Sequence, residues 1–348
     1  MRFPAGTGRK DAFFGLAGGR PVLRWPSRSL TEPMSTLQTP AAPASAEAPP
    51  PSDRAHGGSF LALVGGALAI GFAPIFVRLS EVGPVSTAVW RVVIAVPILW
   101  AVAFLTPADR AAAPPDATSA GRLAGWGTML AAGLFFAGDL AVWHWSIRFT
   151  SVANSTLLAN LAPICVVLYA RFVHGQRPSR RFLGAMAVAM AGMAFLIGRD
   201  FQLDSRALFG DALGVVTAGF YAGYLLSIKA LRGRFPTALV MARTALVTAI
   251  ALLPAAVLSG ETFWPPTVRG WAVVAGLAVV SHVGGQTLIT YALAKLPAAV
   301  ASVTLLIQPV AAALAAAFLL HEPVALAQAL GMVLVLAGVF VARQEGMR

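Results

Sequence analysis

From residue 59 onward the chain alternates between long apolar segments and short connections that contain proline, glycine and charged residues. Most apolar segments are about 20 residues long, the length that a helix needs to cross the hydrocarbon core of a bilayer. Strands of a membrane barrel are shorter and alternate apolar with polar residues, so the pattern indicates helices. We therefore predict an all-α integral membrane protein with ten transmembrane helices, near residues 60–77, 85–105, 125–146, 152–173, 182–198, 210–228, 237–258, 271–292, 298–320 and 325–342.

Residues 1–58 lack this pattern, and we predict that they form a disordered N-terminal tail. The segment 39–51 (TPAAPASAEAPPP) is rich in proline and alanine and shows no apolar periodicity, a composition that does not form a packed core. Met34 is an alternative start of translation. The sequence therefore leaves open whether residues 1–33 belong to the mature protein.

Composition supports the membrane assignment. Hydrophobic residues make up 57% of the chain and charged residues 11%, whereas soluble proteins carry about 25% charged residues. A soluble enzyme is thereby excluded. The formal net charge of +12 indicates membrane topology rather than binding of nucleic acid, because the basic residues lie mostly between the apolar segments. The connections richest in Lys and Arg, such as 174–181 and 229–234, face the cytoplasm when both termini are cytoplasmic, so we predict a multi-pass protein of the inner (plasma) membrane with that orientation.

The sequence offers no cofactor or metal chemistry. Cys165 is the single cysteine, which excludes an intrachain disulfide and a cysteine-based zinc site. No set of His, Asp and Glu has a metal-binding spacing, and no GxxxxGK[ST] phosphate-binding loop is present. We expect neither a metal nor a cofactor, and any transport would be driven by a gradient or by passive exchange.

The chain also repeats itself. Residues 146–163 (SIRFTSVANSTLLANLAP) match residues 292–309 (ALAKLPAAVASVTLLIQP), and Gly184 and Gly192 recur approximately as Gly331 and Gly338. The recurring pairs, at offsets of 152 (84 to 236) and then 146 (163 to 309) residues, are Pro84 with Pro236, Arg91 with Arg243, Trp145 with Tyr291, Pro163 with Pro309, and Gln176 with Glu322. Several pairs in order at nearly constant offset indicate a duplication.

We predict two repeats of five transmembrane helices each, over residues 59–198 and 209–343. Because five is an odd number, the second repeat begins on the opposite side of the membrane, and the two halves are inverted about an axis in the membrane plane. Inverted repeats serve alternating access, in which two halves rock around a central site. The duplication therefore predicts a transporter.

The motifs resemble those of the drug/metabolite transporter superfamily, and specifically its EamA-like members with two repeats. The resemblance covers about residues 60–342 and rests on FAGDLAVWHWSI (136–147), TSVANSTLLANLAP (150–163), HGQRPS (174–179), GAMAVAMAGMAFLIG (184–198), LIQPVAAALAAAFLLHEP (306–323) and GMVLVLAGVF (331–340). It implies export of a small metabolite, an amino acid or a drug-like compound. Gln176 departs from the pattern, because such repeats often place Glu at this position; Glu322 keeps the acid.

An ionisable residue inside a predicted span costs free energy, so its presence indicates a structural or functional role. Arg91 and Asp139 lie at similar depths, about 10 and 12 Å from the same membrane face at 1.5 Å per residue, so we expect a buried ion pair. Asp139 could couple transport to proton movement or meet a cationic group of the substrate; the alternative is a permanent pair that fixes helix register. Arg243, the counterpart of Arg91, is expected to extend its charge to the cytoplasmic interface, with a gate or anion contact as the alternative.

Other polar and aromatic residues extend the candidate site, each with packing as the alternative role. Trp143 lies one helical turn after Asp139, and Gln286 one turn after His282. Asn160 and Gln308 precede Pro163 and Pro309, where each proline frees a backbone carbonyl in the membrane. The candidate substrate-binding or coupling residues are Arg91, Asp139, Trp143, His144, Asn160, Tyr221, Tyr224, Arg243, His282, Gln286 and Gln308.

These observations predict a secondary transporter that exports its substrate by alternating access. The expected partners are a small-molecule substrate and the lipid bilayer; nucleic acid is not expected, and the sequence leaves a homodimer open. The alternative function is a membrane-embedded enzyme acting on a lipid-linked substrate. That function would need clustered catalytic groups at one membrane face, which the short connections do not supply.

Overall fold

The computed structural model describes residues 16–17, 20–21, 53–106, 119–197 and 205–346. The chain divides into residues 1–50 and a helical body, residues 51–348. In the first unit, β1 (Leu16–Ala17) and β2 (Arg20–Pro21) form an antiparallel pair. The other residues of the predicted disordered tail up to 52 lie outside the described residues.

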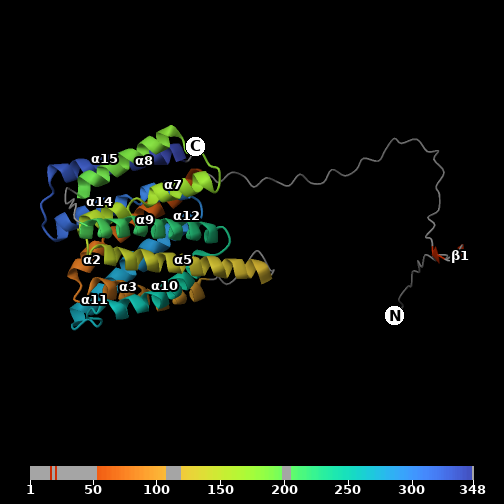
Figure 1. Cartoon of the computed structure of the whole chain (residues 1–348), viewed down its shortest axis with the longest axis horizontal. Coiled ribbons are helices and arrows are strands. Elements are labelled where there is room, and N and C mark those ends of the chain that lie inside the picture. The colour runs from red at the N-terminus through yellow and green to blue at the C-terminus, as the bar shows by residue number, and fades with distance from the viewer. Residues whose placement is uncertain (1–15, 18–19, 22–52, 107–118, 198–204, 347–348) are drawn as a thin grey trace, which may run out of the picture. The chain divides into compact units, whose positions relative to one another are not determined.

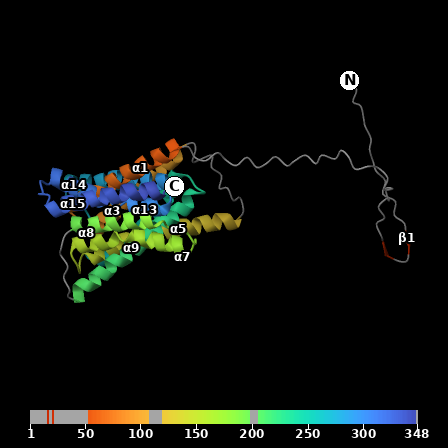
Figure 2. The same cartoon turned by 90° about the horizontal axis from the view of Figure 1, so that it is seen from above.

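The helical body is built from helices that run along a common direction (Figures 1 and 2). Its helices are α1 (Asp53–Gly71), α2 (Ala73–Leu79), α3 (Pro84–Leu105), α5 (Ser119–Ser146), α6 (Val152–Ala159), α7 (Ala162–Phe172), α8 (Arg180–Ile197), α9 (Ser205–Arg232), α10 (Thr237–Ser259), α11 (Val268–Gly276), the π-helix η1 (Leu277–Gln286), α12 (Thr287–Leu293), α13 (Ala298–Thr304), α14 (Ile307–Leu319) and α15 (Leu326–Gly346). Helix α1 begins at residue 53, so six residues that we assigned to the tail are helical. Hydropathy detects only the apolar part of a helix, which explains the difference.

Nine helical segments among the described residues are long and apolar enough to cross a membrane, and the protein is an integral membrane protein of helices as predicted. They are Gly57–Leu79, Pro84–Leu105, Leu123–Ser146, Asn154–Phe172, Ser205–Arg232, Thr237–Ser259, Val268–Leu293, Ala298–Leu319 and Leu326–Gly346. Helix α8, of 18 residues, occupies the remaining predicted span. The count of ten crossings stays a prediction.

Several predicted spans are broken rather than continuous. Helix α6 ends at Ala159 and α7 begins at Ala162, with Pro163 in its first turn. A second break separates α13 from α14, where Pro309 lies in the first turn, and a third separates α1 from α2. Proline has no N–H and clashes with the preceding turn, so it ends one helix and is tolerated at the start of the next.

Helices α8 and α15 lie side by side and antiparallel (Figures 1 and 2). A Cβ on Gly192 would lie 2.7 Å from the carbonyl oxygen of Gly331, and a Cβ on Gly338 would lie 2.6 Å from that of Ala185. The absence of side chains allows the two backbones to approach closely. A shift of 146 residues converts Gly192 into Gly338 and Ala185 into Gly331, so the two contacts are equivalent.

The end of the body at which α2 stops and α3 starts is held by polar contacts between distant segments. The carboxylate of Glu261 accepts hydrogen bonds from the backbone N–H groups of Val85 (2.9 Å) and Ser86 (3.1 Å) at the start of α3. Arg78 at the end of α2 forms an ion pair with Glu322, which follows α14. These contacts tie the ends of helices around the mouth of a cavity.

Candidate functional site

Two adjoining cavities lie inside the helical body. The large chamber has a volume of about 480 Å³ and the small chamber one of about 160 Å³. Together we call them the central cavity. The residues that line both chambers are Ile70, Arg91, Leu140, Trp143, Thr156, Asn160 and Gln308. The large chamber extends to Glu322, so it reaches the end of the body where Arg78 and Glu322 pair.

Arg91 and Asp139 bring opposite charges to the small chamber. Arg91 is 8% exposed, and its guanidinium lies 5.9 Å from the centre of the Phe136 ring, a distance at which a cation is attracted to a ring. The expected direct ion pair is wrong: among the described residues, Arg91 and Asp139 are not within 4.0 Å of each other. Equal depth did not bring the two charged groups into an ion pair, although both side chains line the small chamber. The two charges are therefore available to a ligand.

His144 and Trp143 add a second polar and aromatic wall. Both line the large chamber, and their rings meet edge to face with centroids 4.9 Å apart. His144 Nδ1 lies within hydrogen-bond distance of the Leu140 carbonyl oxygen. Because a carbonyl only accepts, Nδ1 carries the proton, and in the neutral ring Nε2 is then an acceptor. That buried Nε2 has no partner within the protein.

The broken helices place an amide side chain at each break. Asn160 follows α6 and its side-chain amide donates to the Thr156 carbonyl at 2.8 Å. Gln308 lies at the start of α14, and its buried Nε2 has no hydrogen-bond partner within the protein. Both line the two chambers. Helix breaks near mid-membrane in corresponding positions of two repeats are typical of transporter binding sites.

Four further candidate residues lie near the small chamber. Two of them line it and two support its wall. Tyr221 and Gln286 line the small chamber. Tyr224 lies behind them; its hydroxyl donates to Gln286 Oε1 at 3.3 Å and its ring packs 4.7 Å from that of Phe136. His282 is 2% exposed and packs on the same phenylalanine, with ring centroids 5.6 Å apart. Tyr224 and His282 support the wall without lining either chamber.

Arg243 lies outside the central cavity. Its guanidinium packs over Trp126 at 4.1 Å from the ring centre, and its Nη1 lies 3.7 Å from Met129 Sδ. Although Arg91 and Arg243 are counterparts in the two repeats, only Arg91 contributes charge to the cavity. The contact with Trp126, an exposed residue near the start of α5, agrees with an arginine directed toward the membrane interface.

Sequence reasoning missed several residues of the cavity. Thr156 and Thr217 line the small chamber, but hydroxyl residues are common in membrane helices and carry no distinguishing signal. Glu322, which the sequence suggested only as a counterpart of Gln176, forms the rim of the large chamber. Among the described residues no group of three His, Cys, Asp or Glu side chains could hold a metal ion.

Comparisons with known proteins agree with this architecture. The pseudopaline exporter CntI of Pseudomonas aeruginosa is 26% identical over 176 residues, which are 51% of this chain and 60% of the exporter. An uncharacterized transporter of Archaeoglobus fulgidus is 26% identical over 281 residues, 78% of this chain and 91% of that protein. A solved crystal structure has the same fold, with a TM-score of 0.70 at 18% identity, and covers 84% of this chain and 98% of its own.

The family profile matches the chain twice. The description EamA-like transporter family applies to residues 57–198 and again to residues 208–344. Together the two segments include every described helix that lines the central cavity. The chain therefore belongs to the EamA-like transporter family, within the drug/metabolite transporter superfamily, and is a multi-pass membrane protein.

Proposed function

We propose that this protein is a secondary transporter that exports a small metabolite carrying both an anionic and a cationic group, by alternating access between two inverted five-helix repeats. The observation that carries the proposal is the central cavity, in which Arg91 and Asp139 present opposite charges that are not paired with each other. The relative named as a pseudopaline exporter supports the direction of transport.

The equivalent contacts of α8 and α15 support the inverted repeat. Gly192 meets Gly331, and the same contact recurs between Gly338 and Ala185. In a two-fold arrangement residue i of one copy contacts residue j of the other, and j contacts i. Because α8 and α15 are antiparallel, the axis that exchanges them is perpendicular to both helices, in the plane of the membrane.

The membrane orientation of the proposal has both termini in the cytoplasm of a cell with a plasma (inner) membrane. Helix α15 ends close to Arg177, Arg180 and Arg181 at one end of the body. These arginines belong to the excess of basic residues that marks this end as cytoplasmic. The central cavity then opens through the Arg78–Glu322 end toward the outside. The described arrangement corresponds to the outward-facing state of the cycle.

The cavity's polar groups define the ligand chemistry. An anionic group of the substrate would accept hydrogen bonds from the guanidinium of Arg91 and the side-chain amide of Gln308, since a planar guanidinium suits a carboxylate. A cationic group would bind the carboxylate of Asp139, and a neutral donor would bind Nε2 of His144. Trp143 and Tyr221 would pack on the apolar part of the ligand.

Asp139 is also the proposed coupling group. A carboxylate that binds either a proton or a cationic substrate, but not both, links export of the substrate to import of a proton. Asp139 meets the structural condition for this exchange, because it lines the cavity and its carboxylate has no salt-bridge partner among the described residues. Replacement by Asn keeps the shape and removes the exchange.

The test is metabolite profiling of the medium of cells that lack the protein, overproduce it, or overproduce Asp139→Asn. We expect at least one compound with both charges to accumulate outside only when the intact protein is present. Surface expression of the variant is the control. Unchanged export by Asp139→Asn would remove Asp139 from the mechanism, and a medium unchanged by overproduction, followed by no uptake of labelled compounds into liposomes, would contradict transport.

A further inference from the structure

A separate cavity of about 420 Å³ lies at the other end of the body, where α7, α13 and α15 meet the start of α8. We call it the vestibule. Its polar lining consists of Gln176, Arg177, Ser179 and Glu345, and its apolar lining includes Val167 and Val300. Neither chamber of the central cavity shares a residue with it. In the proposed orientation the vestibule faces the cytoplasm.

Two residues that line the vestibule have repeat counterparts that line the large chamber. A shift of 146 residues, the offset that aligns Pro163 with Pro309, converts Val167 into Ala313 and Gln176 into Glu322. Ala313 and Glu322 both line the large chamber. At these two positions the repeats line a cavity at each end of the body, as two mouths of one path would.

A layer of small, buried residues packs against lining residues of both the vestibule and the central cavity. Its members are Ala162, Val166, Ala218 and Ala222, each at most 3% exposed. Tyr221, which lines the small chamber, and Ala299, which lines the vestibule, both pack against this layer. Small side chains interlock weakly, so modest helix movements can separate the layer.

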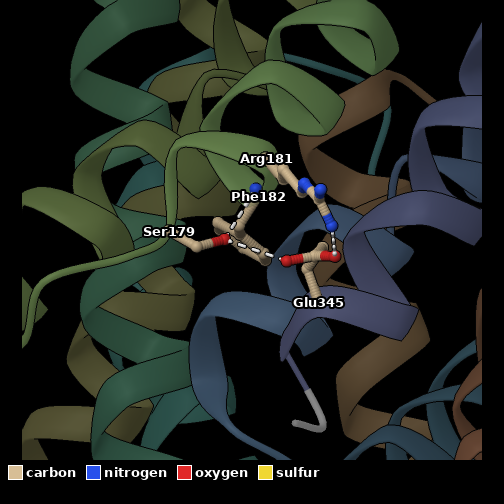
Figure 3. A network of polar contacts seen from close by, with 4 residues as sticks. All are labelled: Ser179, Arg181, Phe182 and Glu345. Atoms are coloured by element: carbon tan, nitrogen blue, oxygen red, sulfur yellow. Dashed lines mark hydrogen bonds and ion pairs between the residues drawn. The ribbon is translucent and has the colours of Figure 1, made fainter.

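The vestibule carries the same kinds of polar group as the central cavity. One guanidinium, one carboxylate and one amide line it (Arg177, Glu345 and Gln176), as Arg91, Asp139 and Gln308 line the central cavity. Figure 3 shows the polar contacts of Glu345 with Ser179 and Arg181. The Ser179 hydroxyl donates to one carboxylate oxygen of Glu345 at 3.3 Å, and Arg181 Nη1 lies 3.7 Å from the other oxygen. This network ties α15 to the start of α8.

We propose that the vestibule is the cytoplasmic access site of the transport path, which receives the same class of two-charged ligand before the ligand crosses the small-residue layer. The Ser179–Glu345–Arg181 network holds α15 against the start of α8 and so keeps the small-residue layer closed, while the vestibule itself is open to the cytoplasm. This inference rests on the proposed function, because it assigns the cytoplasmic mouth to the same path.

The test uses labelling of single cysteines in the full-length protein, in inside-out membrane vesicles. Replacing Cys165 by Ser removes the only cysteine. Ser179→Cys then reports on the vestibule, Val166→Cys (0% exposed) on the layer, and Val257→Cys, 81% exposed on the outside of α10, on lipid-facing sites. The reagents are the membrane-impermeant cationic and anionic methanethiosulfonates. Ala222→Cys replaces Val166→Cys if that variant is misfolded by gel filtration.

We expect Ser179→Cys to react rapidly with both reagents from the cytoplasmic face, Val166→Cys to react slowly, and Val257→Cys not to react. Glu345→Gln or Arg181→Gln should raise the Val166→Cys rate about two- to fivefold, the population shift expected from losing one partly exposed ion pair. Arg180→Gln is the matched control, because Arg180 has no ion-pair partner among the described residues, and should leave the rate unchanged. Arg177→Gln should slow only the anionic reagent at Ser179→Cys.

Two results would overturn the inference. Ser179→Cys that reacts only from the outside would place the vestibule on the wrong side, and a Val166→Cys rate unaffected by Glu345→Gln and Arg181→Gln would make the vestibule a closed pocket. Labelling requires neither substrate nor transport. The expected labelling pattern without any exported compound would therefore contradict the proposed function and leave the access path standing, whereas export with the opposite labelling would contradict only the vestibule.

Discussion

Arg91 and Arg243 occupy the same position in two repeats, yet they have different surroundings. Arg91 lines the central cavity, whereas Arg243 packs on Trp126 outside it. Arg91→Gln should lower the export rate about tenfold or more, because a lost hydrogen bond to a charged group costs about 1.5–3 kcal/mol. Arg243→Gln should change it less than about fivefold, since an exposed cation–π contact contributes about 0.5–1 kcal/mol. Similar losses in both variants would contradict the assignment of Arg91 to the ligand.

The sequence predicted much of the cavity at the scale of residues. Arg91 and Asp139 stand out because ionisable groups are costly in a membrane, Trp143 because it lies one turn after Asp139. Asn160 and Gln308 stand out because they precede prolines, and all five residues line the cavity. It could not predict whether Arg91 and Asp139 touch. Depth along a helix follows from the sequence, but the rotation of two side chains toward a shared cavity depends on how several helices pack.

At the scale of helices, two glycines of α8 differ in how closely other helices pack against them. A Cβ on Gly192 would lie 2.6 Å from the backbone nitrogen of Val335, whereas a Cβ on Gly184 would meet nothing within 4 Å. Gly192→Ala should destabilise the protein by about 1–3 kcal/mol, the usual cost of overpacking. Gly184→Ala should be neutral or stabilising by up to about 1 kcal/mol, because alanine favours the helix.

Thermal unfolding in detergent, followed by tryptophan fluorescence, measures both glycine variants under one condition. The midpoint should fall for Gly192→Ala and stay or rise for Gly184→Ala. An equal decrease in the two variants would mean that helix flexibility, rather than the close approach of α8 and α15, decides the stability of this pair.

The existence of the elements could be predicted better than their continuity. Apolar length located the spans, but a proline in the chain does not reveal whether a helix bends or breaks: Pro163 follows a break, whereas Pro97 lies inside the continuous helix α3. The π-helix η1 had no signal at all. It contains His282 and ends at Gln286, and π-helical turns are rare and occur mostly as bulges within α-helices.

For the whole body, the ion pair between Arg78 and Glu322 joins two segments at the mouth of the central cavity. Each side chain is about half exposed, at 56% and 46%, so the pair should shift the balance between open and closed mouths by a factor of about two to five. Arg78→Glu should change the export rate by that factor, and the exchanged variant Arg78→Glu/Glu322→Arg should restore it. Failure of the exchange to restore the rate, with normal surface expression, would show that the two charges act separately.

The reciprocal contact of Gly192 with Gly331 and of Gly338 with Ala185 also bears on the history of the chain. Before the duplication, a single copy of the unit carried this face alone, and a face that fits itself across a two-fold axis lets identical chains associate in pairs. In the proposed inverted arrangement the axis lies in the membrane plane, so separate identical copies would have to insert in opposite directions, which a strong charge bias prevents. A single chain that holds both copies is free of that constraint, because each half carries its own charges. Gln176 and Glu322 differ in charge at equivalent positions of the two halves.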